Sequence, residues 1–307
     1  MKITQHLRVL EPLPGIVAYY DGRVPGHRFA ERDNWVDDGA LSLGIASYAV
    51  VSGDQALAYD TQVSVAHGAA IRADLQARGV RRLSVVLSHW HLDHVAGTAA
   101  FDDCEVIANR RTRAHLEARR VAIEEGTDHG WPAICPLVMP DVLFSGQMHL
   151  AIGTRQVALI EANIHSDDAT VLWLPQERVL IAGDTVEDCA TYVGAPQDLA
   201  THQAELARLG DLGALVVLPC HGDPDIIAAG GYGADLLEAT SRYIGWLRGL
   251  EVTPDLATTA LADVVADDLA KGTLRWFAPY EAIHRQNIAR ALAHFGRESG
   301  MGHEPKA

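Results

Sequence analysis

Lysine is nearly absent from this chain of 307 residues and occurs only as Lys2, Lys271 and Lys306. Arginine therefore supplies most of the 25 basic residues, which stand against 40 acidic residues and leave a formal net charge of −15. This balance argues against a nucleic-acid partner, because binding to a phosphate backbone relies on clustered lysine and arginine. An anionic substrate would have to be held by arginine, by backbone N–H groups or by bound metal ions.

Long hydrophobic runs and paired cysteines are also missing. Apolar stretches such as Leu215 to Leu218 fall far short of the roughly 20 residues that a membrane-spanning helix needs, and the N-terminal segment lacks the apolar core of a secretory signal. The four cysteines are scattered without paired spacing, at Cys104, Cys135, Cys189 and Cys220. This distribution favours reduced thiols over a disulfide framework. We therefore expect a cytoplasmic protein without a membrane partner.

The hydrophobic pattern predicts an α/β chain. Strands are expected at 16–20, in a hairpin over 47–59 that turns at Gly53-Asp54, and at 83–87, 105–108, 156–162, 170–174, 178–182 and 214–218. Helices are expected at 67–78, 110–125, 198–209, 235–250, 254–270 and 279–295, with Gly79 and Gly126 ending the first two. We expect residues 1–307 to form one domain with a helical C-terminal portion from about residue 235.

The most informative segment is Ser88-His89-Trp90-His91-Leu92-Asp93-His94, which directly follows the apolar strand at 83–87. The polar residues begin where that strand ends, at the sheet edge where open α/β proteins usually carry their chemistry. Histidines separated by one residue project the same way from an extended segment, and a turn through Leu92 brings Asp93 and His94 to a neighbouring point. The segment therefore predicts two adjacent metal sites.

Later strands of the pattern are also followed by residues that bind metals. His165 follows one strand, Asp184 follows the next hairpin, and His221 follows the strand that leads into Pro219. One histidine at a strand end is usually structural, since histidine is often a capped or surface residue. The repetition at three strand ends favours a shared metal centre.

The order His89-x-His91-x-Asp93-His94, then His165, Asp184 and His221, resembles the metallo-β-lactamase superfamily across most of the chain. The resemblance implies that superfamily's αββα sandwich, with two mixed sheets packed face to face and helices outside. It further implies that His89, His91 and His165 hold one metal, that Asp93, His94 and His221 hold a second, and that Asp184 bridges them. Asp60, in Ala58-Tyr59-Asp60-Thr61, resembles the aspartate that supports a metal-bound histidine.

The chemistry of these side chains agrees with that assignment. Neutral imidazole and carboxylate are good ligands for zinc, so two Zn²⁺ ions are expected, with iron or manganese as other candidates. A water shared by two zinc ions is acidified to near neutrality while one metal polarises the substrate carbonyl, so hydrolysis is expected. Asp93 is a candidate catalytic residue that binds the second metal and accepts a proton.

Tyr192 is the other candidate catalytic residue. It lies eight residues beyond Asp184 and resembles a tyrosine that donates to the oxyanion in some lactonases of the superfamily; ordinary packing is the alternative. Trp90 and the segment 129–132 are candidates for a pocket wall and a lid, or for aromatic cover at the rim. Asp168 either orients a ligand or caps the next strand. Cys220 is expected to be a small buried residue, and Gly230 to Gly233 a turn.

We expect a metal-dependent hydrolase of a small lactone, ester, thioester or amide. Glyoxalase II-like thioesterases and true β-lactamases commonly use basic residues to hold substrate carboxylates, so the scarcity of lysine favours a lactone or a neutral ester. The alternatives are a mononuclear iron dioxygenase of the same fold, against which the seven-ligand set argues, and a non-catalytic metal-binding protein. Asp93 and Asp184 argue against the latter. A purely structural zinc site is normally closed by four protein ligands, whereas this ligand set leaves room for water. The C-terminal helices either cover the site or form a homodimer interface.

Overall fold

A computed structural model describes residues 3–301, with side chains described through residue 296. The strands are β1 (Arg8–Leu13), β2 (Ile16–Asp21), β3 (Ile45–Ser52), β4 (Gln55–Tyr59), β5 (Arg82–Leu87), β6 (Glu105–Asn109), β7 (Val142–Phe144), β8 (Gln147–Ile152), β9 (Arg155–Glu161), β10 (Thr170–Leu174), β11 (Val179–Gly183) and β12 (Val216–Pro219). The α-helices are α1 (Val65–Ala77), α2 (Leu92–Val95), α3 (Arg110–Glu125), α4 (Leu199–Gly210), α5 (Pro224–Ala228), α6 (Asp235–Gly249), α7 (Leu261–Val264), α8 (Ala266–Lys271) and α9 (Tyr280–Met301).

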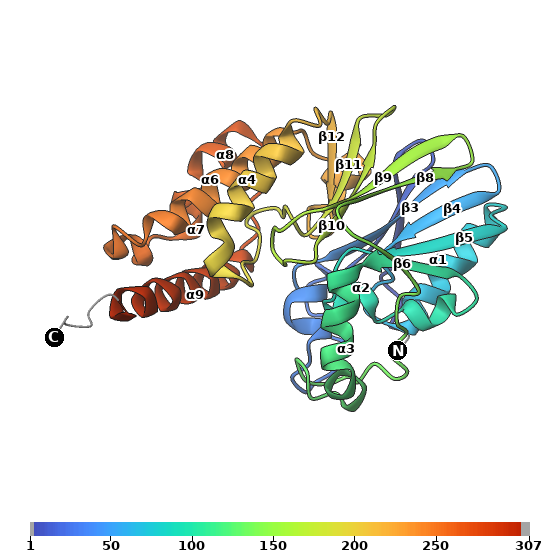
Figure 1. Cartoon of the computed structure of the whole chain (residues 1–307), viewed down its shortest axis with the longest axis horizontal. Helices are drawn as coiled ribbons and strands as arrows, with labels where there is room; N and C mark the ends of the chain where they lie inside the picture. Colours follow the sequence, from blue (N-terminus) through green and yellow to red (C-terminus); the bar gives the residue numbers. More distant parts are fainter. Residues whose placement is uncertain (1–2, 302–307) are drawn as a thin grey trace.

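The strands form two mixed sheets. The first has seven strands in the order β1-β2-β3-β4-β5-β6-β7, and the second has five in the order β12-β11-β10-β9-β8. The first is antiparallel up to β4 and parallel from β4 to β7, while the second is antiparallel except for the parallel pair β11 and β12. With helices outside them, these sheets confirm the predicted αββα sandwich (Figure 1).

Alternation along the strands explains why the first sheet is buried on both faces. In β4 the side chains of Leu57 and Tyr59 join the core between the sheets, whereas Ala56 and Ala58 join the core under the outer helices. Successive residues of a strand point to opposite faces, so one apolar run fills two cores. Helices α4 and α6 pack on each other and contribute Leu206 and other residues to the core of the second sheet.

Two helix ends occur where glycine was predicted to end them. Gly79 follows α1 with φ of 91° and donates its N–H to the carbonyl of Gln76. Gly126 ends α3 in the left-handed conformation, with φ of 70°. Glycine adopts this conformation without the steric cost that a Cβ would add. The Gly53-Asp54 hairpin also forms, between Ser52 of β3 and Gln55 of β4.

The predicted long helix at 254–270 is wrong. The segment contains a 3₁₀ turn over Pro254–Thr258, the one-turn helix α7 and the short helix α8. Thr259 is extended, with ψ of 137°, and Val265 leaves the helical region. β-branched residues at both breaks carry a cost in helices, because their side chains crowd the preceding turn. Strands β1, β7 and β8 lie where no strand was predicted.

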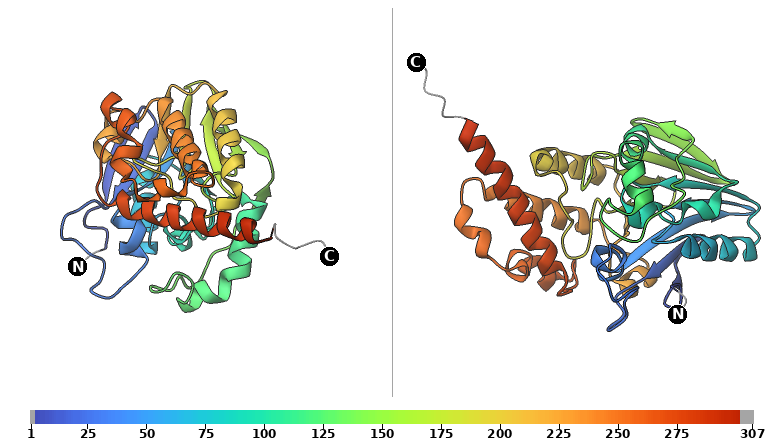
Figure 2. Two further views of the ribbon diagram at one scale, coloured as in Figure 1. Left: turned by 90° about the vertical axis from the view of Figure 1, so that its left-hand side faces the viewer. Right: turned by 90° about the horizontal axis from the view of Figure 1, so that it is seen from below.

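The helices after residue 235 gather at one end of the molecule, beyond the second sheet (Figure 1). Helix α9 is the longest of them and crosses this end, nearly horizontally in the left view and diagonally in the right view of Figure 2. It contacts α6, α7 and the turn Pro196–Asp198. None of the helices within the described residues is long and apolar enough to cross a membrane.

Candidate metal centre

The candidate ligands lie where strand ends of the two sheets meet. His89, His91, Asp93 and His94 follow β5 of the first sheet, on the loop into α2 and on α2 itself. His165 follows β9, Asp184 follows β11 and His221 follows β12, all in the second sheet. The Thr170 N–H donates to the Ser88 carbonyl at 2.8 Å and so joins the two sheets beside the site. Residues separated by more than a hundred positions are thereby brought together.

One group of ligands contains His89, His91 and His165. The Nδ1 atom of His91 lies 2.9 Å from Nε2 of His89 and 2.9 Å from Nε2 of His165. His89 and His165 are buried, while His91 is half-buried. Three imidazole nitrogens thus converge on one point, and together they form a donor set that suits zinc or another borderline divalent ion.

A second group contains Asp93, His94 and His221. Oδ2 of Asp93 lies 3.6 Å from Nε2 of His94 and 3.4 Å from Nε2 of His221. The Asp93 side chain is 18% exposed, whereas that of His94 is fully buried. The second group therefore opens to solvent on the side of Asp93.

Asp184 lies between the two groups. Its Oδ2 atom is 3.8 Å from Nε2 of both His89 and His165, and 3.1 and 3.5 Å from Nε2 of His94 and His221. A carboxylate oxygen within reach of both groups is suited to offset the repulsion between two cations. The structure thus brings together all seven residues that the sequence indicated as ligands.

Neighbouring oxygens hold the remaining nitrogens of four histidines. Nδ1 of His94 lies 2.8 Å from Oδ2 of Asp60, and Nδ1 of His89 lies 2.9 Å from the Ser88 hydroxyl. The other two histidines contact backbone carbonyls: Nδ1 of His221 lies 2.7 Å from the Gly44 oxygen, and Nδ1 of His165 lies 3.1 Å from the Tyr192 oxygen. Such contacts fix the tautomer and the ring orientation of a metal-binding histidine.

The protonation state of the first group suits a bound cation. Burial lowers the pKa values of His89, His91 and His165, so these imidazoles are neutral, as metal ligands must be. Burial alone would raise the pKa of Asp184, but His94 and His221 hold that pKa well below its ordinary value. Asp184, between the two groups, therefore carries a negative charge.

The residues fit the metal pair that the donor set implies. Oδ1 of Asp184 is buried and has no hydrogen-bond partner among the described residues, and buried Nε2 of His94 has only the ion-pair contact with Oδ2 of Asp184 at 3.1 Å. Leaving a buried polar atom unpaired costs about 1–3 kcal/mol of folding free energy, so both atoms are expected to contact a bound metal ion. The other side-chain polar atom of each residue already has a contact: Oδ2 of Asp184 faces the candidate ligands, and Nδ1 of His94 faces Asp60.

Trp90 and His129 line one side of the centre. The Trp90 ring centroid is 4.5 Å from that of His91 and 5.7 Å from that of His129, and His129 itself lies 6.5 Å from His91. Trp131 instead stacks on Phe29 at 5.0 Å, so the 129–132 segment is attached to the loop that follows β2. Asp168 accepts the Trp90 N–H at 3.0 Å and therefore orients the ligand loop.

Three further positions have structural explanations. Cys220 is buried, and burial raises the pKa of its thiol well above the ordinary value, so it lacks the thiolate of a nucleophile. Gly230 and Gly231 form a turn that places Tyr232 opposite Val217, in agreement with the turn prediction. Sequence patterns did not indicate Glu187, which is buried with Oε1 3.8 Å from Nδ1 of His165; burial raises the pKa of Glu187 to about 7.

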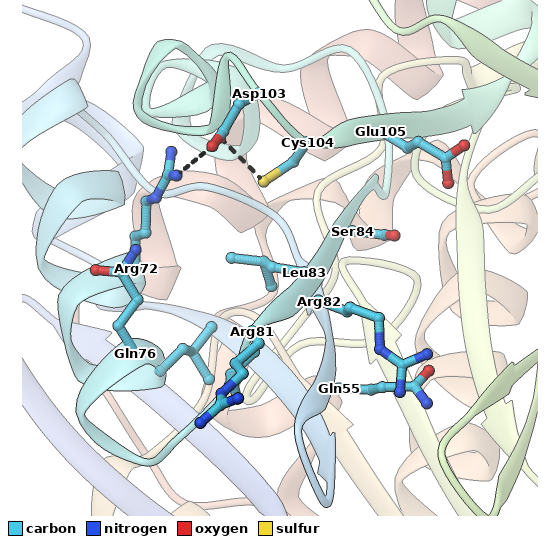
Figure 3. A pocket seen from close by; sticks show the side chains of 12 residues that line it. Gln55, Arg72, Gln76, Arg81, Arg82, Leu83, Ser84, Asp103, Cys104 and Glu105 are labelled. Carbon is cyan, nitrogen blue, oxygen red and sulfur yellow. Dashed lines mark hydrogen bonds and ion pairs between the residues drawn. The ribbon is translucent and has the colours of Figure 1, made fainter.

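A separate pocket of about 460 Å³ lies at the opposite edge of the first sheet, where β5 begins (Figure 3). Arg72 and Arg82 line it, but each already pairs with a carboxylate, Arg72 with Asp103 at 2.6 Å and Arg82 with Asp54 at 2.9 Å. This pocket contains none of the candidate ligands.

Comparison with known proteins identifies the family. The profile described as the metallo-beta-lactamase superfamily matches residues 43–221, more than half of the chain and the span that carries every candidate ligand. The chain belongs to the metallo-beta-lactamase superfamily. Helices α5 to α9 lie beyond the matched span.

Two curated proteins are similar to this superfamily member in sequence. A beta-lactamase-like protein 2 homolog from Caenorhabditis elegans is 27% identical over 45% of this chain and 41% of the relative. An atrochrysone carboxyl ACP thioesterase from Paecilomyces divaricatus is 28% identical over 71% of this chain and 61% of the relative. The chain thus spans about four to six tenths of the length of these relatives.

Solved structures support the same fold. A metallo-beta-lactamase from Pontibacter korlensis aligns with a TM-score of 0.55 at 20% identity, covering 76% of this chain and 99% of the other. A metallo beta lactamase from Hirschia baltica aligns with a TM-score of 0.55 at 18% identity, covering 78% of this chain and 98% of the other. At these identities the likeness establishes the fold.

Proposed function

We propose that this protein is a hydrolase that uses two zinc ions to cleave small carboxylic esters, including thioesters and lactones. The observation that carries the proposal is the position of Asp184, whose Oδ2 atom lies within 3.8 Å of ligand nitrogens from both groups. A site for one structural zinc is normally closed by four protein ligands. Six candidate donors around one shared carboxylate favour two metals with room for water.

Zinc ions bound here would acidify a shared water and polarise the substrate carbonyl. Asp93 is the catalytic carboxylate of the proposal. Burial alone would raise the pKa of Asp93, but His94 and His221 lower it, so the group is ionised. In the reaction the water oxygen bonds to the acyl carbon, the bond to the alcohol or thiol breaks, and the leaving group takes up a proton. Asp93 accepts and passes on that proton.

Tyr192 is the proposed donor to the oxyanion. Its ring centroid lies 5.7 Å from that of His165, and burial raises the pKa of its hydroxyl, which therefore keeps its proton. No hydrogen bond joins this hydroxyl to another of the described residues, so the proton is available to a substrate. The thioesterase relative from Paecilomyces divaricatus adds support for thioesters within the proposed substrate class.

The test combines metal analysis with the variant Asp184→Asn. Protein purified without added metal is expected to contain close to two zinc per chain and to hydrolyse members of a panel of thioesters, esters and lactones. D184N is expected to lose metal occupancy and at least about 100-fold in kcat/KM together. Asp21→Asn, a buried carboxylate that pairs with His67, is the matched control and is expected to retain both metals.

Two results would contradict the proposal. D184N with both metals and full turnover would remove the bridging role of this carboxylate. Iron at one site per chain, without hydrolysis of any substrate in the panel, would instead favour the mononuclear dioxygenase chemistry known in the same fold.

A further inference from the structure

Five arginines of this acidic chain stack on aromatic rings instead of pairing with carboxylates. They are Arg8, Arg23, Arg32, Arg119 and Arg290, whose guanidinium carbons lie 3.5 to 5.0 Å from ring centroids. Arg8, Arg23 and Arg32 stack on rings away from the first ligand group. Arg119 and Arg290 stack on Trp90 and Tyr192, which lie beside that group, and are therefore the pair of interest. Among the side chains of residues 3–296, neither of these two arginines forms an ion pair, although the sequence has 40 acidic residues.

Arg119 and Arg290 approach the metal centre through different helices. Arg119 of α3 lies 4.1 Å from the Trp90 ring, which in turn lies 4.5 Å from the His91 ring. Arg290 of α9 lies 5.0 Å from the Tyr192 ring, which lies 5.7 Å from the His165 ring. Each guanidinium is therefore one aromatic ring away from a ligand of the first group.

The two ligands beside these stacks are themselves in contact, since Nδ1 of His91 lies 2.9 Å from Nε2 of His165. Both arginines consequently flank the same end of the metal centre. A substrate held at the first ligand group would therefore have each guanidinium one aromatic ring away.

Few of the donors on either guanidinium are used. Arg119 contacts Nδ1 of His115 at 3.3 Å, and Arg290 contacts the Gly194 carbonyl at 3.5 Å. A guanidinium carries five N–H donors in a planar fork that matches a carboxylate. Stacking on a ring holds that plane in place, and Arg119 is half-buried while Arg290 is exposed. No other hydrogen bond of either guanidinium to a side chain or backbone group is found in the part of the chain that the structure describes, so the remaining donors can bind a ligand.

We propose that Arg119 and Arg290 select a substrate whose acyl part ends in a carboxylate. This inference rests on the proposed hydrolase function and names its substrate class. It departs from the neutral lactone expected from the scarcity of lysine, because arginines carried on Trp90 and Tyr192 supply the positive charge at the site. A chain of net charge −15 repels anions in general, so a local pair of unneutralised arginines is informative.

The test uses pairs of N-acetylcysteamine thioesters that differ only in charge. Succinyl, glutaryl and adipyl thioesters are compared with the matching terminal carboxamides, and kcat/KM is measured for each. The wild-type enzyme is expected to prefer the charged member of at least one pair by about tenfold or more, as a charge-assisted hydrogen bond provides. Arg119→Gln combined with Arg290→Gln is expected to remove that preference.

Matched controls separate local binding from the overall charge. Arg120→Gln on α3 and Arg285→Gln on α9 remove the same charge from the same helices, but these arginines pair with Glu124 and Glu281. The combined control variant is expected to keep the preference. No charged preference at any chain length, or an equal loss in the control variant, would overturn the proposal.

Binding of glutarate gives a readout that does not need turnover. Calorimetry on the zinc-loaded protein is expected to show at least about fivefold weaker glutarate binding in R119Q/R290Q than in wild type, and unchanged binding in R120Q/R285Q. If none of the thioesters is cleaved, thioesters are removed from the proposed substrate class, while this comparison still decides the role of the two arginines. Equal glutarate affinity in all three proteins would reject that role.

Discussion

Asp60 shows how one residue behind the ligands orients the centre. It is fully buried, accepts the Ser88 N–H through Oδ1 at 2.7 Å and contacts Nδ1 of His94 through Oδ2 at 2.8 Å. The carboxylate therefore fixes both the start of the ligand loop and the ring of His94. The sequence indicated this role only through the resemblance of the Tyr59-Asp60-Thr61 segment to the superfamily.

We expect Asp60→Asn to weaken zinc binding at the group of Asp93, His94 and His221 by about 10- to 100-fold, the usual effect of losing a carboxylate behind a ligating histidine. Competition with a chromophoric chelator measures this affinity. The buried pair of Asp21 and His67, joined at 2.9 Å, provides the control. Asp21→Asn is expected to lower the free energy of unfolding and leave zinc affinity unchanged; equal zinc affinities in D60N and wild type would refute the assignment.

His202 of α4 is a second informative residue. It is fully buried, neither ring nitrogen has a hydrogen-bond partner within the described part of the chain, and burial lowers the pKa of His202 to about 4. The folded protein therefore holds a neutral imidazole that the unfolded chain protonates near pH 6.5. Stability contributed by this difference is present above the unfolded pKa and is lost as the pH falls toward 4.

Replacement of this imidazole removes that dependence. From about pH 7.5 to about pH 5, the free energy of unfolding of His202→Leu is expected to rise by about 2 kcal/mol relative to wild type, as one pKa unit corresponds to about 1.4 kcal/mol. Urea denaturation at several pH values measures it. His149→Leu, at an exposed histidine of β8, should show no such trend; a trend equal in both variants would disprove the role of His202.

At the scale of elements, α9 holds the segment between Asp184 and Ala195. The Tyr280 hydroxyl donates to Oε2 of Glu187 at 3.0 Å, and Asn287 accepts the Val193 N–H at 2.8 Å while donating to the Thr191 carbonyl at 2.9 Å. The segment carries both Asp184, the proposed bridging carboxylate, and Tyr192. Helix α9 lies outside the span matched by the family profile, yet it positions part of the centre.

Asn287→Ala leaves the Val193 N–H and the Thr191 carbonyl without these partners. We expect a loss of about 3 kcal/mol in the free energy of unfolding, since each unpaired buried group costs about 1–3 kcal/mol. Hydrogen exchange at the amide of Val193 should accelerate as the segment loosens. Gln286→Ala, at the exposed neighbour, is the control, and unchanged protection of Val193 in N287A would refute this function of α9.

A helix or strand could be predicted from the sequence where residues at its own ends fix where it starts and stops. Helix α3 begins and ends where predicted, because Asn109 accepts the Arg111 N–H at its start and Gly126 ends it in the left-handed conformation. Strand β8 has alternating exposure and lies at the edge of its sheet, where pairing with β9 stabilises it. Its residues Met148, Leu150 and Ile152 alternate along the sequence as in a half-buried strand, but the run is short and its conformation depends on this pairing.

At the scale of the whole molecule, the metal centre joins the two sheets. The first sheet supplies four candidate ligands and the second supplies the other three, His165, Asp184 and His221. Buried tyrosines cross the same boundary: Tyr59 donates to the Thr170 carbonyl at 2.6 Å, and Tyr48 donates to the Pro219 carbonyl at 2.5 Å. Bound metals would therefore link the two halves of the sandwich at the point where these hydrogen bonds already hold them.

Chelation of the metals is expected to lower Tm by on the order of 10 °C, because ligands that bind only the folded state stabilise it by mass action. Scanning calorimetry with and without EDTA measures the shift, and elemental analysis verifies that the metals have left. D184N, with reduced occupancy, should show a smaller shift. An unchanged Tm after complete removal would mean that the metals contribute nothing to holding the sheets together.

The sequence by itself determined the family, the αββα fold and the identity of the candidate ligands, because these depend on residue type, on strand periodicity and on the positions of polar residues after strands. It could not show that Asn287 of α9 holds the segment carrying Tyr192, or that Arg119 and Arg290 flank the same pair of histidines. Those relations join residues far apart in the chain. Only the packing of α3 and α9 around the two sheets decided them, since local patterns carry no record of contacts made across the molecule.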